Sequence, residues 1–129
     1  GVEAMPGALE LVSSLVGRVP IAVASNTNLA DTLRVLQRSP LPDADFDSVV
    51  CASERITPKP APDVYLAACD AIGSEPSETL AFEDSPVGAA AAIAAGLYVI
   101  GIPAIAGARM ETHATINSLA ELSADHLLR

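Results

Sequence analysis

The sequence has few aromatic residues and only two cysteines. Aromatic residues make up 3% of the 129 residues and tryptophan is absent, whereas half of the residues are hydrophobic. The core therefore has to be built from Ala, Val, Leu and Ile. The two cysteines, Cys51 and Cys69, lack metal-ligand spacing and are too few for a disulfide framework, so we expect both to be small buried residues.

Basic residues are also scarce. Lys and Arg together number 7, against 16 Asp and Glu, which gives a formal net charge of −9. Binding to nucleic-acid phosphates needs clustered Lys and Arg, and anionic membrane surfaces attract the same residues. The composition therefore argues against nucleic-acid and membrane partners. An anionic substrate would need a local Lys and a bound cation to offset the field of the whole protein.

Long hydrophobic runs and targeting segments are missing too. The longest apolar run, Ala89–Ala95, is too short to span a bilayer, and the first residues lack the basic and apolar regions of a signal peptide. These absences lead us to expect a soluble cytoplasmic protein. The length predicts one domain or part of one, so residues 1–129 are treated as a single unit.

Apolar stretches of strand length alternate with helical patterns along the chain. Nearly every expected strand is apolar throughout, which is typical of a parallel sheet covered on both faces. The alternation predicts a doubly wound α/β fold with a three-layer arrangement. The expected strands are 21–24, 48–52, 79–82, 98–102 and 114–116, and the expected helices are 8–16, 29–37, 63–72, 87–95 and one capped by Ser118.

Three of the expected strands are followed by polar residues that suit phosphate chemistry. Ser25 and Asn26 follow the first strand, Lys59 lies between two prolines after the second, and Glu83 and Asp84 end the third. The carboxyl ends of strands in an open α/β sheet meet at one edge, where ligands bind. A hydroxyl, a Lys and two carboxylates that hold Mg²⁺ suit phosphoryl transfer at this edge.

Each of these features has a simpler interpretation on its own. Ser25 could cap a helix, Lys59 could be a surface residue, and Glu83 with Asp84 could be a turn and capping pair. Their order on successive strand ends favours one common site over three unrelated features.

Four segments in this order resemble the haloacid dehalogenase superfamily, and more closely its β-phosphoglucomutase-like phosphatase and phosphomutase branch. Lys-Pro-Ala-Pro-Asp followed by Glu-Asp-Ser is more specific than any single piece. The resemblance covers almost the whole chain and implies the Rossmann-like core of that superfamily. The segments are Ile21–Asn26, Lys59–Asp63, Phe82–Gly88 and Ala94–Gly96.

The resemblance implies a role for each candidate residue. Ser25 would be the phosphate-binding hydroxyl, and Asn26 would line the same pocket. Lys59 would be catalytic, stabilising the nucleophile and the phosphoryl group, and Glu83 and Asp84 would hold Mg²⁺. The implied substrate is a small phosphorylated metabolite.

The sequence departs from the family at the nucleophile. The family uses the first Asp of an Asp-x-Asp-Gly motif as nucleophile and the second as general acid/base, and no such motif occurs here. The segment Asp43–Phe46 has two carboxylates, but it precedes a strand and lacks the Gly, so we reject it. The family's first strand, its nucleophile and its cap domain would lie upstream of Gly1.

That first strand would occupy the centre of the sheet, between strands 21–25 and 79–84. Buried backbone groups need partners, so three outcomes are open. The two strands could pair directly, another chain could supply a strand through a dimer or strand exchange, or the sequence could be part of a longer protein. We expect a closed or repaired sheet, because an open apolar edge invites pairing.

The leading functional hypothesis is the C-terminal core of an Mg²⁺-dependent phosphatase or phosphomutase that works through an aspartyl-phosphate and is inactive as this chain alone. The alternative is a non-catalytic fragment or a binding or dimerisation module with the same fold. A dehalogenase is disfavoured because those relatives lack the Glu83–Asp84 pair. A dinucleotide-binding enzyme is disfavoured because no Gly-x-Gly-x-x-Gly follows a strand.

Overall fold

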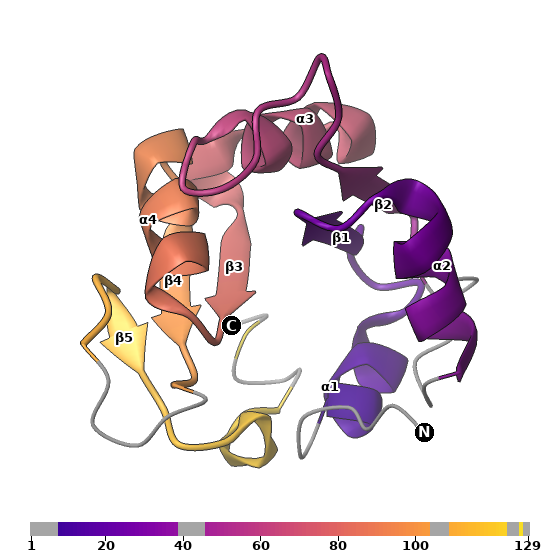
Figure 1. Ribbon diagram of the computed structural model, residues 1–129. Coiled ribbons are helices and arrows are strands. Elements are labelled where there is room, and N and C mark those ends of the chain that lie inside the picture. The colour runs from indigo at the N-terminus through magenta and orange to yellow at the C-terminus, as the bar shows by residue number, and fades with distance from the viewer. Residues whose placement is uncertain (1–7, 39–45, 104–108, 124–126, 128–129) are drawn as a thin grey trace.

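The protein folds as an α/β layer in which helices and strands alternate (Figure 1), which confirms the predicted fold class. The computed structural model describes residues 8–38, 46–103, 109–123 and 127. The strands are β1 (Ala22–Ser25), β2 (Ser48–Cys51), β3 (Leu80–Glu83), β4 (Tyr98–Gly101) and β5 (Ala114–Thr115). The helices are α1 (Ala8–Leu15), α2 (Leu29–Arg38), α3 (Asp63–Ile72) and α4 (Pro86–Ala95), with short 3₁₀ turns η2 (Pro76–Glu78) and η3 (Leu119–Glu121).

The helix boundaries follow from local sequence signals. Ser85 caps α4, because its hydroxyl oxygen accepts a hydrogen bond from the Gly88 N–H, and Pro86 occupies the first helical position. The helices α3 and α4 end at Gly73 and Gly96, whose φ values of 70° and 91° lie in the left-handed region that favours glycine. These signals fix where α4 begins and where α3 and α4 end.

The helices cover both faces of the strands. Side chains alternate between the faces of a strand, so Ala81 and Phe82 of β3 enter two different apolar clusters. Ala81 packs with α3 and α4 in a cluster dominated by alanines, whereas Phe82 packs against the cluster of Leu11 from α1 and Leu119 from η3. The arrangement is therefore three-layered. No helix in the described ranges is long and apolar enough to cross a membrane.

The two cysteines differ in burial. Cys69 of α3 is buried in the alanine-rich cluster, as predicted. Cys51, at the end of β2, is only half-buried, so the prediction that both are buried is wrong for this residue. Its thiol reaches the hydroxyl of Thr32 on α2, because β2 is the outer strand next to that helix.

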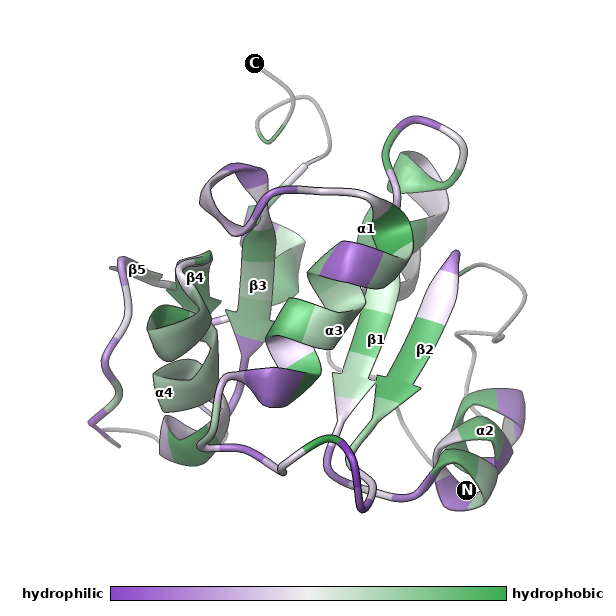
Figure 2. Ribbon diagram, turned by 90° about the horizontal axis from the view of Figure 1, so that it is seen from above, coloured by the Kyte–Doolittle hydropathy of each residue, from purple (hydrophilic) through white to green (hydrophobic). Residues whose placement is uncertain are grey.

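The strands form two separate parallel sheets among the described residues. One sheet has the order β1-β2 and the other β3-β4-β5. Figure 2 shows β1, β2 and β3 pointing toward the same edge, with α3 lying across the space between β1 and β3. A cavity of about 540 Å³ occupies this space. We call it the inter-strand cavity; its lining includes Ala22, Ala24, Tyr65, Leu80 and Phe82.

We expected a closed or repaired sheet, and direct closure between β1 and β3 does not occur among the described residues. Helix α3 packs against β1, β2 and α4 at once, and so spans both sheets. Direct pairing would bring β1 and β3 to a separation of about 4.8 Å and would require α3 to leave part of this packing. Repair of the sheet by a second chain stays a prediction.

Candidate active site

Lys59 joins the two sheets at the edge where their strands end. Its Nζ atom donates to Glu83 Oε2 of β3 at 2.7 Å and to the Ala24 carbonyl oxygen of β1 at 3.0 Å. The Lys59 side chain is 11% exposed and that of Glu83 is 7% exposed. An ammonium group carries three protons, so one N–H of Lys59 remains for an anionic ligand.

Tyr65 of α3 holds the acidic partner of this ion pair. Its hydroxyl donates a short hydrogen bond to the same Glu83 oxygen, and its ring centroid lies 4.8 Å from Lys59 Nζ. Burial raises the pKa of Tyr65 well above its usual range, and the charge of Glu83, the hydrogen bond and the charge of Asp84 raise it further. Tyr65 therefore stays neutral and keeps donating its proton.

Glu83 is enclosed on its remaining side by the first turn of α4. A Cβ atom on Gly88 would overlap the Glu83 carboxylate, so only glycine lets the carboxylate lie against the helix. With Oε2 bound by Lys59 and Tyr65, this carboxylate has little freedom to move. Asp84, the next residue, is exposed at the same edge.

Asn26 forms two hydrogen bonds with the backbone of the loop that carries Lys59. The Lys59 N–H donates to Asn26 Oδ1 at 2.7 Å, and Asn26 Nδ2 donates to the Lys59 carbonyl oxygen at 3.2 Å. This pair of bonds positions the lysine backbone beside the end of β1. Contact between Asn26 and a phosphate group stays a prediction. The backbone N–H and the second amide proton of Asn26 are the donors that remain for it.

Ser25, the last residue of β1, presents its hydroxyl at the start of the same loop. Its Oγ accepts from the Thr27 N–H at 3.1 Å and lies 3.2 Å from the Thr32 hydroxyl oxygen. The structure thus brings Ser25, Asn26 and Lys59 together, with Lys59 in direct contact with Glu83. The sequence order had predicted this convergence at one sheet edge.

The acidic pair fits the donor set of a magnesium site. Mg²⁺ commonly takes one or two protein carboxylates and completes its shell with water and substrate phosphate oxygens. Asp84 is exposed and has a free approach, whereas Glu83 is already bonded to Lys59 and Tyr65. Within the described ranges, no group of three or more His, Cys, Asp or Glu side chains forms a metal-binding cluster. The assignment of Mg²⁺ to both carboxylates stays a prediction.

Two contributors to this edge were missed in the sequence. Tyr65 is one of only four aromatic residues, and a large phenol in an alanine-rich core is a signal that its hydroxyl needs a partner. Thr32 lies in the apolar stripe of α2 with Leu29, Leu33 and Leu36, and a hydroxyl in such a stripe also needs a partner. The rejected segment 43–46 lies mostly outside the described residues.

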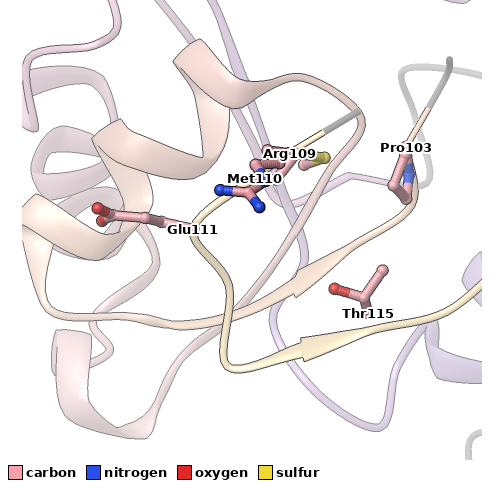
Figure 3. A pocket seen from close by; sticks show the side chains of 5 residues that line it. All are labelled: Pro103, Arg109, Met110, Glu111 and Thr115. Atoms are coloured by element: carbon pink, nitrogen blue, oxygen red, sulfur yellow. The ribbon is translucent and has the colours of Figure 1, made fainter. Parts of the chain in front are cut away.

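A second cavity, of about 430 Å³, lies beside β4 and β5 (Figure 3). Pro103, Arg109, Met110, Glu111 and Thr115 line it. It contains none of the residues at the Lys59 edge. The candidate site is therefore the strand-end edge above the inter-strand cavity.

Known proteins resemble this chain in sequence and in fold. The model of a family described as haloacid dehalogenase-like hydrolase matches residues 2–96. This chain belongs to the haloacid dehalogenase-like hydrolases. Membership confirms the resemblance seen in the segments around Ser25, Lys59 and Glu83.

Named proteins match this sequence over most of the chain. CbbY from Rhodobacter capsulatus is 37% identical over 102 residues, which cover 77% of this chain and 45% of CbbY. A probable pseudouridine-5'-phosphatase from Drosophila melanogaster is 38% identical over 109 residues, or 78% of this chain and 46% of the relative. A crystal structure of a mutant CbbY from Rhodobacter sphaeroides in complex with xylulose-(1,5)bisphosphate has a TM-score of 0.83 and 27% identity, covering 93% of this chain and 56% of that one. The chain therefore spans about half the length of these relatives.

Proposed function

We propose that this chain is the phosphoryl-binding core of an Mg²⁺-dependent phosphatase or phosphomutase, which acts on a small phosphorylated metabolite through an aspartyl-phosphate. The observation that carries the proposal is the position of Lys59. Its ammonium group joins Ala24 of one sheet to Glu83 of the other and keeps one N–H for a ligand. A fixed cation at a strand-end edge is what a phosphoryl group needs.

Each residue has a defined part in this proposal. Lys59 neutralises charge on the phosphoryl oxygens, and Ser25 donates its hydroxyl proton to one of them. Asp84, with Glu83 as the second candidate ligand, would hold Mg²⁺. When bound, the metal supplies charge neutralisation at the phosphoryl group. Asn26 keeps the Lys59 loop at the end of β1.

The nucleophile is the part that this chain does not supply. No Asp-x-Asp-Gly occurs among its 129 residues, so an attacking aspartate has to come from another segment. The inter-strand cavity lies between the two strands that meet at Lys59, and an incoming strand there would bring its carboxyl end to the site. We infer that such a strand comes from outside these 129 residues, through a longer chain, a dimer or strand exchange.

The relatives support the substrate class without identifying the substrate. One is named a probable pseudouridine-5'-phosphatase, and another was crystallised with xylulose-(1,5)bisphosphate. We therefore propose a small metabolite that carries a phosphate ester, in a cytoplasmic setting. Selection among such metabolites is expected to lie outside the Lys59 edge, since the roles proposed there concern the phosphoryl group, the metal and the positions of Lys59 and Glu83.

The alternative is a binding or dimerisation module, and the open inter-strand cavity favours it. Two unpaired strand edges invite a strand from a second chain. Strand exchange between two copies would double the mass measured in solution, whereas the phosphatase core requires no second copy of itself.

Hydrolysis of an aryl phosphate in the presence of Mg²⁺ tests the proposed function. We expect no turnover by this chain alone, because it contributes no nucleophilic aspartate. Turnover that is abolished by Asp84→Asn or Lys59→Ala would contradict the proposed inactivity. Asp84→Asn is the cleaner variant, since Asp84 is exposed and its loss leaves no buried charge unpaired.

A further inference from the structure

Thr32 is a buried polar residue on α2 that contacts Ser25 of the candidate site. It is 6% exposed and lies in an otherwise apolar stripe of the helix. Its hydroxyl is 3.2 Å from Ser25 Oγ and 3.2 Å from the Thr27 carbonyl oxygen. Buried hydroxyls are normally hydrogen-bonded, so these contacts account for its burial. They also connect it to the residue proposed to bind phosphate.

The hydrogen bonds around Ser25 determine what its own proton can do. A hydroxyl has one proton and two acceptor lone pairs. Ser25 Oγ accepts from the Thr27 N–H at 3.1 Å. The single proton of Thr32 has two acceptors at 3.2 Å, Ser25 Oγ and the Thr27 carbonyl oxygen, and when it goes to Ser25 both lone pairs of Ser25 Oγ are used. The Ser25 proton is then left as a donor for a group outside this cluster.

The Cys51 thiol adds a further bond to this cluster. It donates to Thr32 Oγ1 at 3.5 Å from the β2 residue that pairs with Ser25 of β1. This bond uses one of the two lone pairs of Thr32 Oγ1 and is compatible with either use of the Thr32 proton. When Thr32 donates to Ser25, the bonds run in one direction, from the Cys51 thiol to Thr32, from Thr32 to Ser25, and from Ser25 to the ligand.

We propose that Thr32 is a positioning residue that directs the Ser25 hydroxyl proton toward a phosphoryl oxygen. This inference rests on the proposed function, because it assigns Ser25 to phosphate. The competing arrangement sends the Thr32 proton to the Thr27 carbonyl and turns the Ser25 proton back onto Thr32. In that arrangement Ser25 would present its hydroxyl oxygen, and not its proton, to an anionic ligand.

The two arrangements predict opposite effects of Thr32→Val, which keeps the shape of the side chain and removes the hydroxyl. The measurement is the dissociation constant of inorganic phosphate with Mg²⁺ present, from an NMR titration of the whole chain. We expect Thr32→Val to weaken binding about fivefold to tenfold, the size of one hydrogen bond. Thr32→Ser should restore wild-type affinity. In a Ser25→Ala background, Thr32→Val should have no further effect.

Unchanged or tighter binding by Thr32→Val would overturn the role of Thr32, provided that Ser25→Ala weakens binding. If Ser25→Ala leaves the affinity unchanged as well, Ser25 does not bind phosphate, and both the proposed function and the role of Thr32 fail. Thr32→Ala replaces the valine variant if the latter does not fold. If Thr32→Val weakens phosphate binding as much in the Ser25→Ala background as in the wild type, its effect is a general structural one, and the proposal is overturned.

Discussion

At the scale of single residues, the site depends on one buried ion pair and the groups that hold it. Lys59 and Glu83 are both nearly enclosed, and breaking such a pair by removing one partner costs about 3–5 kcal/mol. Tyr65 and the absence of a side chain at Gly88 hold Glu83 in place. Weaker phosphate binding by a Lys59 variant would therefore combine the loss of a contact with the loss of stability.

Tyr65 makes the stability of the fold sensitive to alkaline pH. Because its pKa is raised above the ordinary value of 10.0, the unfolded chain releases this proton at lower pH than the folded chain. The stabilising contribution is fully present below about pH 10 and is lost as pH rises above it. We expect the free energy of unfolding of the wild type to fall more steeply between pH 10 and 11.5 than that of Tyr65→Phe, by up to about 1.4 kcal/mol per pH unit.

Urea unfolding at a series of pH values measures this difference. Tyr98→Phe is the matched control, since Tyr98 is half-exposed and lies at the start of β4 away from Lys59. It should keep the steep alkaline loss of the wild type. Parallel pH profiles for the wild type and Tyr65→Phe would contradict a buried, neutral Tyr65 in this network.

The residues of the site were largely predictable, but their contacts were not. Ser25, Lys59 and Glu83 follow strands, and strand ends of a parallel sheet meet at one edge, so spacing was enough to group them. The bonds from Tyr65 to Glu83 and from Thr32 to Ser25 depend on where α3 and α2 pack. Helix packing brings together residues that no sequence spacing relates, so these partners needed the structure.

At the scale of elements, the main feature is the pair of strand edges that face the inter-strand cavity. In β1, the carbonyl groups of Ile21 and Ser25 accept hydrogen bonds from the β2 side, and in β3 those of Thr79 and Glu83 accept from the β4 side. Backbone groups of successive strand residues point in alternate directions. The residues whose backbone groups face the cavity are therefore Ala22, Ala24, Leu80 and Phe82.

Amide hydrogen exchange should reveal this alternation. We expect the N–H groups of Ala24, Leu80 and Phe82 to exchange at least about tenfold faster than those of Val23 and Ala81, because the latter face a neighbouring strand. Equal protection at low protein concentration would contradict an open cavity. Protection that appears only as the concentration rises would indicate that a second copy supplies the strand.

The elements themselves were predicted more reliably than their pairing. Apolar runs bounded by glycines and prolines predicted the five strands and helices α1 to α4 within a residue or two, because both signals are local. The helix expected after Ser118 is only the short 3₁₀ turn η3 in the described residues. The separation into two sheets was not predicted, since hydrogen-bonding demand alone favours closure. Packing of α3 against β1, β2 and α4 competes with that demand, and only the structure shows which one prevails.

At the scale of the whole molecule, the chain belongs to the haloacid dehalogenase-like hydrolases and spans about half the length of the relatives it matches. It brings the candidate residues Asn26, Lys59 and Glu83 into contact at one sheet edge. Helix α3 and the bonds of Lys59 connect two sheets that have no strand in common among the described residues. With a net charge of −9, the molecule as a whole repels phosphate. Any affinity for phosphate has to come from the Lys59 edge and from a bound cation.

The most direct test is an NMR titration of the wild-type chain with inorganic phosphate, which identifies every amide whose chemical shift changes. The account predicts that the amides around Ser25, Lys59 and Asp84 shift together with one dissociation constant, and that Mg²⁺ lowers this constant. Chemical-shift changes confined to other segments would contradict a shared phosphate and metal site at this edge. A dissociation constant that Mg²⁺ leaves unchanged would contradict it as well.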